Sequence, residues 1–516
     1  MSRFRWALPV VVVAILGLSI VEPASALRLR SQAAEPAVKK PGGGGSSAVA
    51  SCITCHNLYE GEHPFAKDPI KSDQFITLNS GAIWQKKDPH AKAYEVLSGK
   101  LAVEMGKKLK MKPTEDNRCM TCHSTDLQPK AITKQNEWDS ARFETFPDYG
   151  VSCTACHGTG LKWQVEHYEV TQGKIDWREQ SADHKKSRGL HDLRDPVVKA
   201  KLCVSCHVGN HEQGKMVTHE MYAAGHPPLP PFELSTYTQG EPAHWAKPSE
   251  GSLKYFKDKK DTWEKFHFHP KAEESSVARE YAVGVIAALQ AEVDLLVAEA
   301  KRAKAEEGSI DFARFDCYAC HHDLKHPSER QNLATAKPPG RPSIRASFGP
   351  PAMVVVEHAS TATNTELKSK VDHFHENWKS LNLASMAKPF GNPDLVIPAG
   401  VTMNKWCESF LQYQSTCATP LYPPPEAGNL LKSIAKNLKQ PIADPETAMV
   451  LTWAYINLSH DLDQKLELTA LDKFIPLSVR TDPATQTLDW KSRSDAIRKF
   501  EADPFREAFK KLKPEK

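Results

Sequence analysis

The most regular pattern of hydrophobic positions in the chain lies between residues 281 and 308. Apolar side chains recur there at the spacing of one helix face: Tyr281, Val285, Leu289, Val293, Leu296 and Ala300. Gly308 follows the stripe and can end a helix, because glycine tolerates the backbone conformations found at helix ends. The pattern therefore predicts one long helix with an apolar stripe.

A second helical region follows the proline-rich stretch at residues 337–351. One apolar stripe consists of Leu367, Val371, Phe374, Trp378 and Leu381. Asp444 and Pro445 are a typical helix start, and the nearly all-apolar segment after them runs through Trp453 and Leu458. These patterns predict a C-terminal part built mainly of helices.

The N-terminus has the pattern of a secretory signal peptide. Arg3 and Arg5 precede an apolar run, and Ala24-Ser25-Ala26 supplies the small residues of a cleavage site. A transmembrane anchor is the alternative, but an apolar run of about 15 residues falls short of the roughly 20 that a spanning helix needs. We therefore expect cleavage after residue 26 and export to the periplasm.

Ten of the 12 cysteines belong to one repeated pattern, Cys-x-x-Cys-His, which occurs five times. The motifs are motif 1 (Cys52, Cys55, His56), motif 2 (Cys119, Cys122, His123), motif 3 (Cys153, Cys156, His157), motif 4 (Cys203, Cys206, His207) and motif 5 (Cys317, Cys320, His321). This pattern is typical of c-type haem attachment, where two thiols form thioether bonds and the histidine becomes the proximal iron ligand. The sequence therefore predicts five covalently attached haems c.

Zinc sites and redox-active dithiols also use Cys-x-x-Cys pairs. Zinc ribbons usually need two pairs per metal and no fixed histidine, so five pairs would leave one over. No alternation of strand and helix surrounds the pairs, which disfavours a thioredoxin-like role. Haem attachment is the interpretation that uses every motif.

The motifs and the apolar patterns together predict the organisation of the chain. The expected parts are a signal peptide at 1–26, a flexible linker at 27–50, a pentahaem cytochrome c domain at 51–330, a proline-rich linker at 331–352 and a helical domain at 353–516. The haem region is too short for each haem to have its own domain core, so the haems must supply much of that core. The expected fold class is mainly α, with a loop-rich haem domain.

Cys407 and Cys417 are the two cysteines outside the motifs. In an oxidising compartment they could form a disulfide. The bridge would close a loop of 11 residues, which contributes about 3 kcal/mol by the loop-entropy estimate. We therefore expect this bridge in the helical domain.

Four stretches of the chain resemble multihaem cytochromes c, in particular the tetrahaem electron carriers that work with hydroxylamine oxidoreductase. They are WQKKDPHAKAY (84–94), GVSCTACHG (150–158) with His167 behind it, CVSCH with HEMYAAGHPPLPPFEL (219–234), and FDCYACHHDL (315–324). The resemblance implies that His90, His167 and His226 are distal haem ligands. The fifth motif and the C-terminal region depart from the tetrahaem pattern, so the partner enzyme is not implied.

Further histidines are candidates on position alone, since distal ligands are expected in loops near a motif. His63 and His219 are such candidates, whereas His184, His191 and His244 are interpreted as surface or core histidines, and His373 and His375 as solvated residues. His322 follows His321 directly and cannot reach the opposite side of the same iron. In other multihaem cytochromes, adjacent histidines look like ligands of two neighbouring haems. We hypothesise this role for His322, with a bond to a propionate or backbone carbonyl as the alternative.

Covalent haems with two histidine ligands each favour electron transfer over catalysis, because no coordination position is left for a substrate. The alternative is an oxidoreductase that acts on a small nitrogen or sulfur compound at one haem with an open position. Ammonia-forming nitrite reductases typically have lysine as the proximal ligand of the active haem, whereas all five motifs here end in histidine. Redox proteins are the expected partners; the net charge of +4 indicates no nucleic-acid site, and a membrane is expected only through an uncleaved signal peptide.

Overall fold

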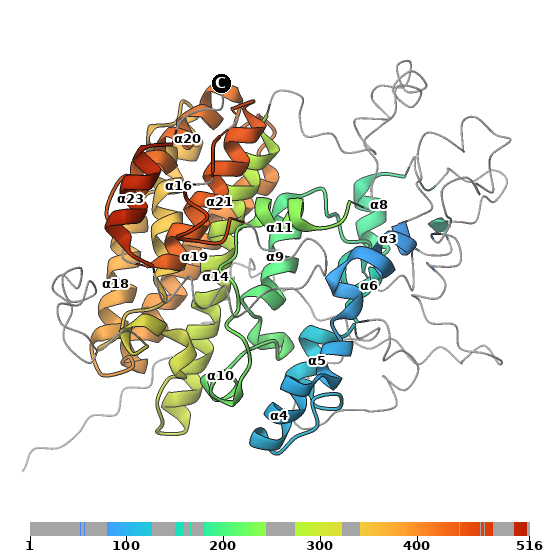
Figure 1. Ribbon diagram of the computed structural model, residues 1–516. Helices are drawn as coiled ribbons and strands as arrows, with labels where there is room; N and C mark the ends of the chain where they lie inside the picture. Colours follow the sequence, from blue (N-terminus) through green and yellow to red (C-terminus); the bar gives the residue numbers. More distant parts are fainter. Residues whose placement is uncertain are drawn as a thin grey trace, which may run out of the picture. The chain divides into compact units, whose positions relative to one another are not determined.

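The computed structural model describes residues 52, 56, 80–125, 150–158, 163, 166–167, 177, 180–243, 274–321, 341–442, 444–464, 466–468, 470–477 and 500–512 (Figure 1). All of them belong to one compact unit, Ser46–Lys516. Helices dominate, and within these ranges the only β-type pairings are two isolated bridges. The expected mainly α fold is confirmed. The expected signal peptide and flexible linker lie outside the described residues.

Short helices make up the described part before residue 243. They are α3 (Ser80–Lys87), η1 (Pro89–Lys92), η2 (Glu95–Ser98), α4 (Lys100–Leu109), α5 (Asn117–His123), α6 (Cys153–His157), α8 (Ala182–Ser187), α9 (Pro196–His207), η6 (His211–Gln213), α10 (His219–Ala224) and α11 (Leu234–Gly240). One small apolar cluster here consists of Leu97, Cys119 and Met120. Little side-chain core is therefore available around motif 2.

Longer helices follow from residue 276 onward. They are α14 (Ser276–Ala305), η8 (Phe312–Arg314), η9 (Cys317–Ala319), η10 (Ala346–Phe348), α16 (Gly349–Thr361), α17 (Thr365–Ser369), α18 (Phe374–Met386), α19 (Pro393–Thr416), α20 (Pro424–Leu438), α21 (Pro445–Asp461) and α23 (Ala502–Lys510). Asp444 caps α21 by accepting the Thr447 N–H at 2.6 Å, as its position before Pro445 predicts.

Helix α14 is the expected long helix, but it is buried on almost every side. The stripe from Tyr281 to Ala300 is buried, and so are Val283, Ile286 and Ala287 on its other faces. Such a helix belongs in a protein core or a membrane. Of the described helices, α14 is the one long and apolar enough to cross a membrane, and most of its apolar segment is covered by protein. In Figure 1 it runs among α16, α19 and α21, which it contacts.

Glycines let two partners approach α14 closely. A Cβ atom on Gly400 of α19 would collide with Val297 of α14, and a Cβ on Gly284 would lie 2.5 Å from Leu234 Cβ at the start of α11. Close backbone contact of this kind requires a residue without a side chain. One continuous apolar core therefore extends from α9 and α11 through α14 to the helices after residue 346.

This continuous core runs across the expected division at residues 331–352, which stays a prediction. The long helix before that stretch shares its core with the helices after it, so residues 353–516 do not form a separate core. The described end of the proline-rich stretch is itself part of the packing: Phe315 and Ile344 form an antiparallel bridge, and the Asp316 N–H donates to the Ser343 carbonyl at 2.9 Å. Proline content indicates a break in helices and does not show which apolar faces meet.

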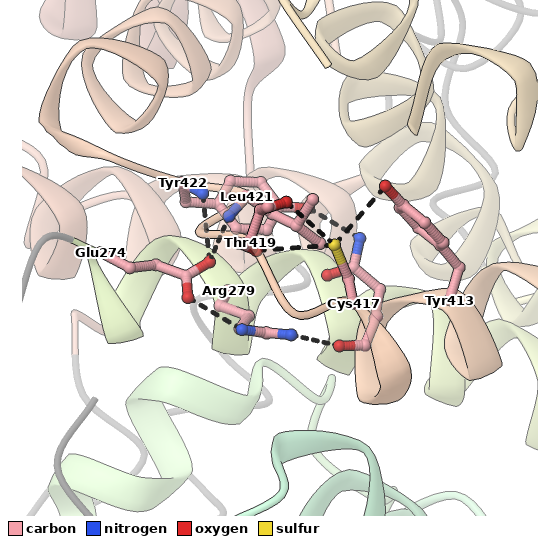
Figure 2. A network of polar contacts seen from close by, with 8 residues as sticks. Glu274, Arg279, Tyr413, Cys417, Thr419, Leu421 and Tyr422 are labelled. Atoms are coloured by element: carbon pink, nitrogen blue, oxygen red, sulfur yellow. Dashed lines mark hydrogen bonds and ion pairs between the residues drawn. The ribbon is translucent and has the colours of Figure 1, made fainter. Parts of the chain in front are cut away.

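The expected Cys407–Cys417 disulfide is wrong. Both cysteines are thiols, Cys407 buried inside α19 and Cys417 at its C-terminal end. Ten helical residues place their Cα atoms about 15 Å apart, whereas a disulfide needs less than about 7 Å. The Cys417 thiol instead lies 3.5 Å from the Tyr413 hydroxyl and 3.3 Å from the Thr419 hydroxyl (Figure 2).

The same close-up shows how the start of α14 is fixed (Figure 2). Glu274 accepts the N–H groups of Leu421 and Tyr422 at 2.8 and 3.1 Å. It also forms an ion pair with Arg279 at 2.8 Å, and Arg279 donates to the Gln414 carbonyl. This buried pair therefore joins α14 to the segment that follows α19.

The apolar stripe from Leu367 to Leu381 belongs to two helices rather than one. His373 separates α17 from α18 and has a left-handed backbone conformation, with φ of 63°. Leu367, Phe374 and Leu381 are nevertheless all buried. His373 and His375 are exposed, as expected for solvated residues.

Candidate functional site

The four Cys-x-x-Cys-His motifs that the structure describes in full, motifs 2 to 5, lie on single helical turns. Motif 2 ends α5, which Asp116 caps by accepting the Arg118 N–H at 2.9 Å; motif 3 is α6, and motif 4 ends α9. In motif 5 the His321 N–H donates to the Cys317 carbonyl at 2.8 Å, which closes a helical turn. Residues three and four apart share one side of a helix. Each described motif therefore directs its sulfur atoms and its imidazole to the same side.

His56 of motif 1 lies beside His167, which follows motif 3 in the chain. The two ring centres are 6.0 Å apart and the ring planes are inclined by 22°. The Nδ1 atom of His56 is 2.9 Å from the Ser80 hydroxyl, so the other ring nitrogen is available for a ligand. Burial lowers the pKa of His56, which favours a neutral imidazole.

His207 of motif 4 lies beside His90 in the same way. Their ring centres are 6.1 Å apart, with an edge-to-face angle of 81°. Burial lowers the pKa of His207 to about 3, so its imidazole is neutral at physiological pH. Burial also opposes charge on His90, but the hydrogen bond and negative charge of Asp88 outweigh it and leave that pKa raised.

His321 of motif 5 lies beside His219, the first residue of α10. Their ring centres are 6.4 Å apart and the planes are inclined by 33°. The His219 N–H donates to the Asp311 carboxylate at 3.0 Å, which fixes the start of α10 against the segment before motif 5. This residue was a candidate from its position alone, and the structure brings it to motif 5.

His123 of motif 2 and His226 are close enough to interact electrostatically. Burial lowers the pKa of His226, the hydrogen bond to the Pro227 carbonyl opposes this, and a positive charge on His123 would lower the pKa further. The Nδ1 atom of each ring faces a backbone carbonyl: Ala93 O is 2.8 Å from His123 Nδ1, and Pro227 O is 2.7 Å from His226 Nδ1. A carbonyl only accepts, so Nδ1 must carry the proton and Nε2 the lone pair.

The ring separations fit a metal ion between two imidazoles. Two metal–nitrogen bonds of about 2 Å each, with each ring centre about 1 Å behind its nitrogen, place the two centres about 6 Å apart. The measured values are 6.0, 6.1 and 6.4 Å. Carbonyl or carboxylate groups beside Nδ1 are also the partners that metal-binding histidines usually have. The residues present therefore fit haem iron with two axial imidazoles.

Sulfur atoms from different motifs also meet. A hydrogen bond joins the Cys122 and Cys206 thiols; it raises the pKa of Cys122 and lowers the pKa of Cys206 to about 5. A similar bond joins Cys52 to Cys153, where it raises the pKa of Cys52 and lowers the pKa of Cys153. The attachment points of motifs 2 and 4, and of motifs 1 and 3, therefore lie side by side.

The structure also places two of the histidines that were interpreted as surface or core residues, whereas His244 lies outside the described residues. His191 lies beside motif 3, with its Nδ1 atom 3.0 Å from the Cys156 carbonyl, whereas His184 contacts Glu166 at 2.8 Å. No sequence signal distinguished these two histidines, because both follow motif 3 in a polar segment. Cys55, His63 and His322 lie outside the described residues, so their roles stay predictions.

Comparisons with known proteins agree with the motifs over part of the chain. Residues 51–158 and 152–225 match the family model described as cytochrome c554 and c-prime. The matched segments contain motifs 1 to 4 with His90, His167 and His219, and they end one residue before His226. No curated protein and no solved structure was found to match. The family match supports a multihaem c-type cytochrome; motif 5 and the helices from α14 onward lie beyond it.

Proposed function

We propose that this chain, a multihaem c-type cytochrome by its family match, carries electrons through five covalently attached haems. The observation that carries the proposal is the pairing of motif histidines with histidines from distant segments. Three such pairs have ring centres 6.0 to 6.4 Å apart. A histidine on each side of the iron leaves no coordination position for a substrate, which favours an electron carrier.

The pairs supply a proposed ligand set for four motifs. The proximal and distal residues are His56 with His167, His123 with His226, His207 with His90, and His321 with His219. The cysteines of each motif hold the haem by thioether bonds. When bound, haem supplies one-electron redox chemistry. His63 and His322 remain proposed alternatives for distal positions.

The protein contributes orientation and charge control to these sites. In His90, His123 and His226 the Nδ1 atom is hydrogen-bonded, so Nε2 is the nitrogen left to bind iron. Burial lowers the pKa of His123 as well as that of His207, so both imidazoles stay neutral and ready to coordinate. Short-range contacts within the fold therefore set the orientation and the protonation state of the proposed ligands.

The proposal extends to location and partners. Covalent haem attachment and the N-terminal pattern favour export to the periplasm, where other redox proteins would donate and accept the electrons. The resemblance to tetrahaem carriers of the hydroxylamine oxidoreductase system supports redox proteins as the class of partner. It does not identify the partner, since motif 5 and the helical region after it are additions to that pattern.

Mass spectrometry and electron paramagnetic resonance test the proposal together. Protein expressed with a haem-attachment system should begin near Leu27 and carry five haems, of which those at motifs 1, 2, 4 and 5 should be low-spin. Replacing Cys317 and Cys320 with serine should remove one haem, whereas the control Cys417→Ser should keep five. Four or fewer haems on the mature wild-type protein would disprove the count. A high-spin haem that binds nitrite, hydroxylamine or sulfite would favour the alternative oxidoreductase.

A further inference from the structure

Two buried ion pairs lie next to motif 5. Arg345 pairs with Glu446, the second residue of α21, at 2.9 Å, and both side chains are only 10% exposed. Arg314 pairs with Glu292 of α14 at 2.8 Å, with both side chains 3% exposed. Neither pair belongs to the residues matched by the family model. The helical region thus places four charges close to the haem site proposed at motif 5.

Backbone pairing fixes Arg345 against the start of motif 5. The antiparallel bridge between Phe315 and Ile344, with the Asp316 N–H bonded to the Ser343 carbonyl, places residues 343–345 alongside residues 314–316. Cys317 follows immediately. The position of Arg345 is therefore set by the same contact that holds the motif, and it does not depend on a flexible side chain reaching across solvent.

The spacing along the chain shows how near these charges are to motif 5. Ile344, which is bridged to Phe315, directly precedes Arg345, and Phe315 lies two residues before Cys317. Glu446 lies 2.9 Å from Arg345, so both charges of the pair are beside the segment that leads into motif 5.

A purely structural role does not require these charges. Desolvating an ion pair costs about as much as the attraction returns, and apolar residues of similar size often replace such pairs without loss. Among the described residues, the Nε atom of Arg345 has no hydrogen-bond partner, although Glu446 also accepts from the Ser347 hydroxyl at 3.2 Å. The pair is therefore incompletely satisfied as a structural element, which points to a role for its charge.

We propose that Arg345 and Glu446 set the reduction potential of the haem held by motif 5, with Arg345 favouring the reduced state and Glu446 opposing it. This inference rests on the proposed function. Reduction adds one electron, and so one negative charge, at the site. A buried positive charge nearby stabilises the added charge, and a buried negative charge destabilises it, because the protein interior screens charges weakly. Both residues act through this field and are positioning residues rather than ligands.

Charge-removing variants test the proposal by redox titration. Arg345→Gln should lower the reduction equilibrium constant of one haem at least about tenfold, which is about 59 mV for one electron. Glu446→Gln should raise the potential of the same haem, and the double variant should return close to the wild-type value. A protein with serine at positions 317 and 320 identifies the transition that belongs to motif 5.

The Arg279–Glu274 pair provides a matched control. It is also a buried arginine–glutamate pair, but it lies at the start of α14 (Figure 2). The neighbouring Ser275 bonds to Asp461, the last residue of α21, whereas Glu446 is near the first. Arg279→Gln should leave all five potentials unchanged. Arg345→Lys keeps the charge, and it serves as a second variant if Arg345→Gln does not fold.

Three results would overturn the proposal. In the first, Arg345→Gln and Glu446→Gln retain five haems and all five potentials stay at wild-type values. In the second, the two variants shift the potential in the same direction, as general loosening of the fold would. In the third, the wild-type protein carries no haem at Cys317 and Cys320, and the five-haem proposal then fails as well. The first two results leave the proposed function intact.

Discussion

His90 and His207 come from distant parts of the chain, yet their rings meet edge to face with centres 6.1 Å apart. His207 ends α9 as the last residue of motif 4, and His90 lies in the short helix η1, where Asp88 accepts its N–H at 2.9 Å. The protein thus holds one imidazole by a haem motif and the other by a capped turn. Both parts of the pair are fixed by local structure, and only their meeting depends on the tertiary fold.

Replacing His90 with alanine should open one axial position without preventing haem attachment. Cys203 and Cys206 remain to form the thioether bonds, so intact mass spectrometry should still show five haems. Electron paramagnetic resonance should show one low-spin haem converted to high-spin, because the second imidazole is lost.

The control for this variant is His373→Ala. His373 is exposed and contacts Glu376 at 3.0 Å, far in sequence from any motif. Its replacement should leave all haem spectra unchanged. An unchanged low-spin spectrum for His90→Ala would show that another residue is the distal ligand of motif 4.

Cys407 and Cys417 should both react with a thiol reagent after unfolding without reductant. The helical distance between them excludes a bridge within the fold. In the native protein, Cys417 should be labelled faster than Cys407, because Cys407 is completely buried. Mass spectrometry of the labelled peptides measures both rates. Two blocked cysteines in the unfolded protein would mean that α19 is not continuous between them.

Local features of this protein could be predicted from its sequence, and features that depend on which surfaces meet could not. The motifs, the capped start of α21 at Asp444 and the long helix through Leu289 follow from spacing and capping rules that involve neighbouring residues. The apolar stripe of α14 did not show that its other faces are buried as well, because a periodicity argument follows one face and leaves out residues such as Val283 and Ile286. The break at His373 was missed for a similar reason, since the apolar spacing continues across it.

The residues around motif 5 illustrate the same limit. Arg345 lies within the proline-rich stretch and Glu446 lies in the first turn of a helix, where acidic residues are common. Nothing in either local sequence indicates that the two side chains form a buried pair 2.9 Å apart. A charged residue becomes a candidate for setting a potential only when its burial and its neighbours are known.

Replacing Gly400 with alanine should destabilise the protein by about 1–3 kcal/mol, since overpacking a well-packed core costs that much. The new methyl group would collide with Val297 where α19 crosses α14. The matched control is Gly428→Ala in α20, where nothing lies within 4 Å of the new atom. That variant should be stabilised by up to about 1 kcal/mol, because alanine is the better helix former. Urea unfolding followed by circular dichroism measures both; equal stabilities would contradict the close packing.

Asp444→Asn should change how stability depends on pH. Burial, followed by the charges of Glu446 and Asp316, raises the pKa of Asp444 to about 7 in the folded protein, whereas an aspartate in the unfolded chain titrates at about 3.9. The folded state therefore binds the extra proton between these values. The stability contributed by this carboxyl is full below about pH 4, falls as the pH rises towards 7, and is lost above that.

Asparagine does not titrate, but it can still cap α21 at Thr447 through its side-chain oxygen. The free energy of unfolding of Asp444→Asn, relative to that of the wild type, should therefore rise between about pH 4 and 7. The relative change in the folding equilibrium constant is at most about tenfold per pH unit. The control Asp394→Asn removes a carboxyl whose pKa the hydrogen bond to Lys304 lowers. Because Asp394 is exposed, the difference in free energy of unfolding between that variant and the wild type should stay constant over this range. Urea unfolding at pH 4.5, 6 and 7.5 measures the three proteins, and a constant difference between Asp444→Asn and the wild type would mean that Asp444 is already charged at pH 4.5.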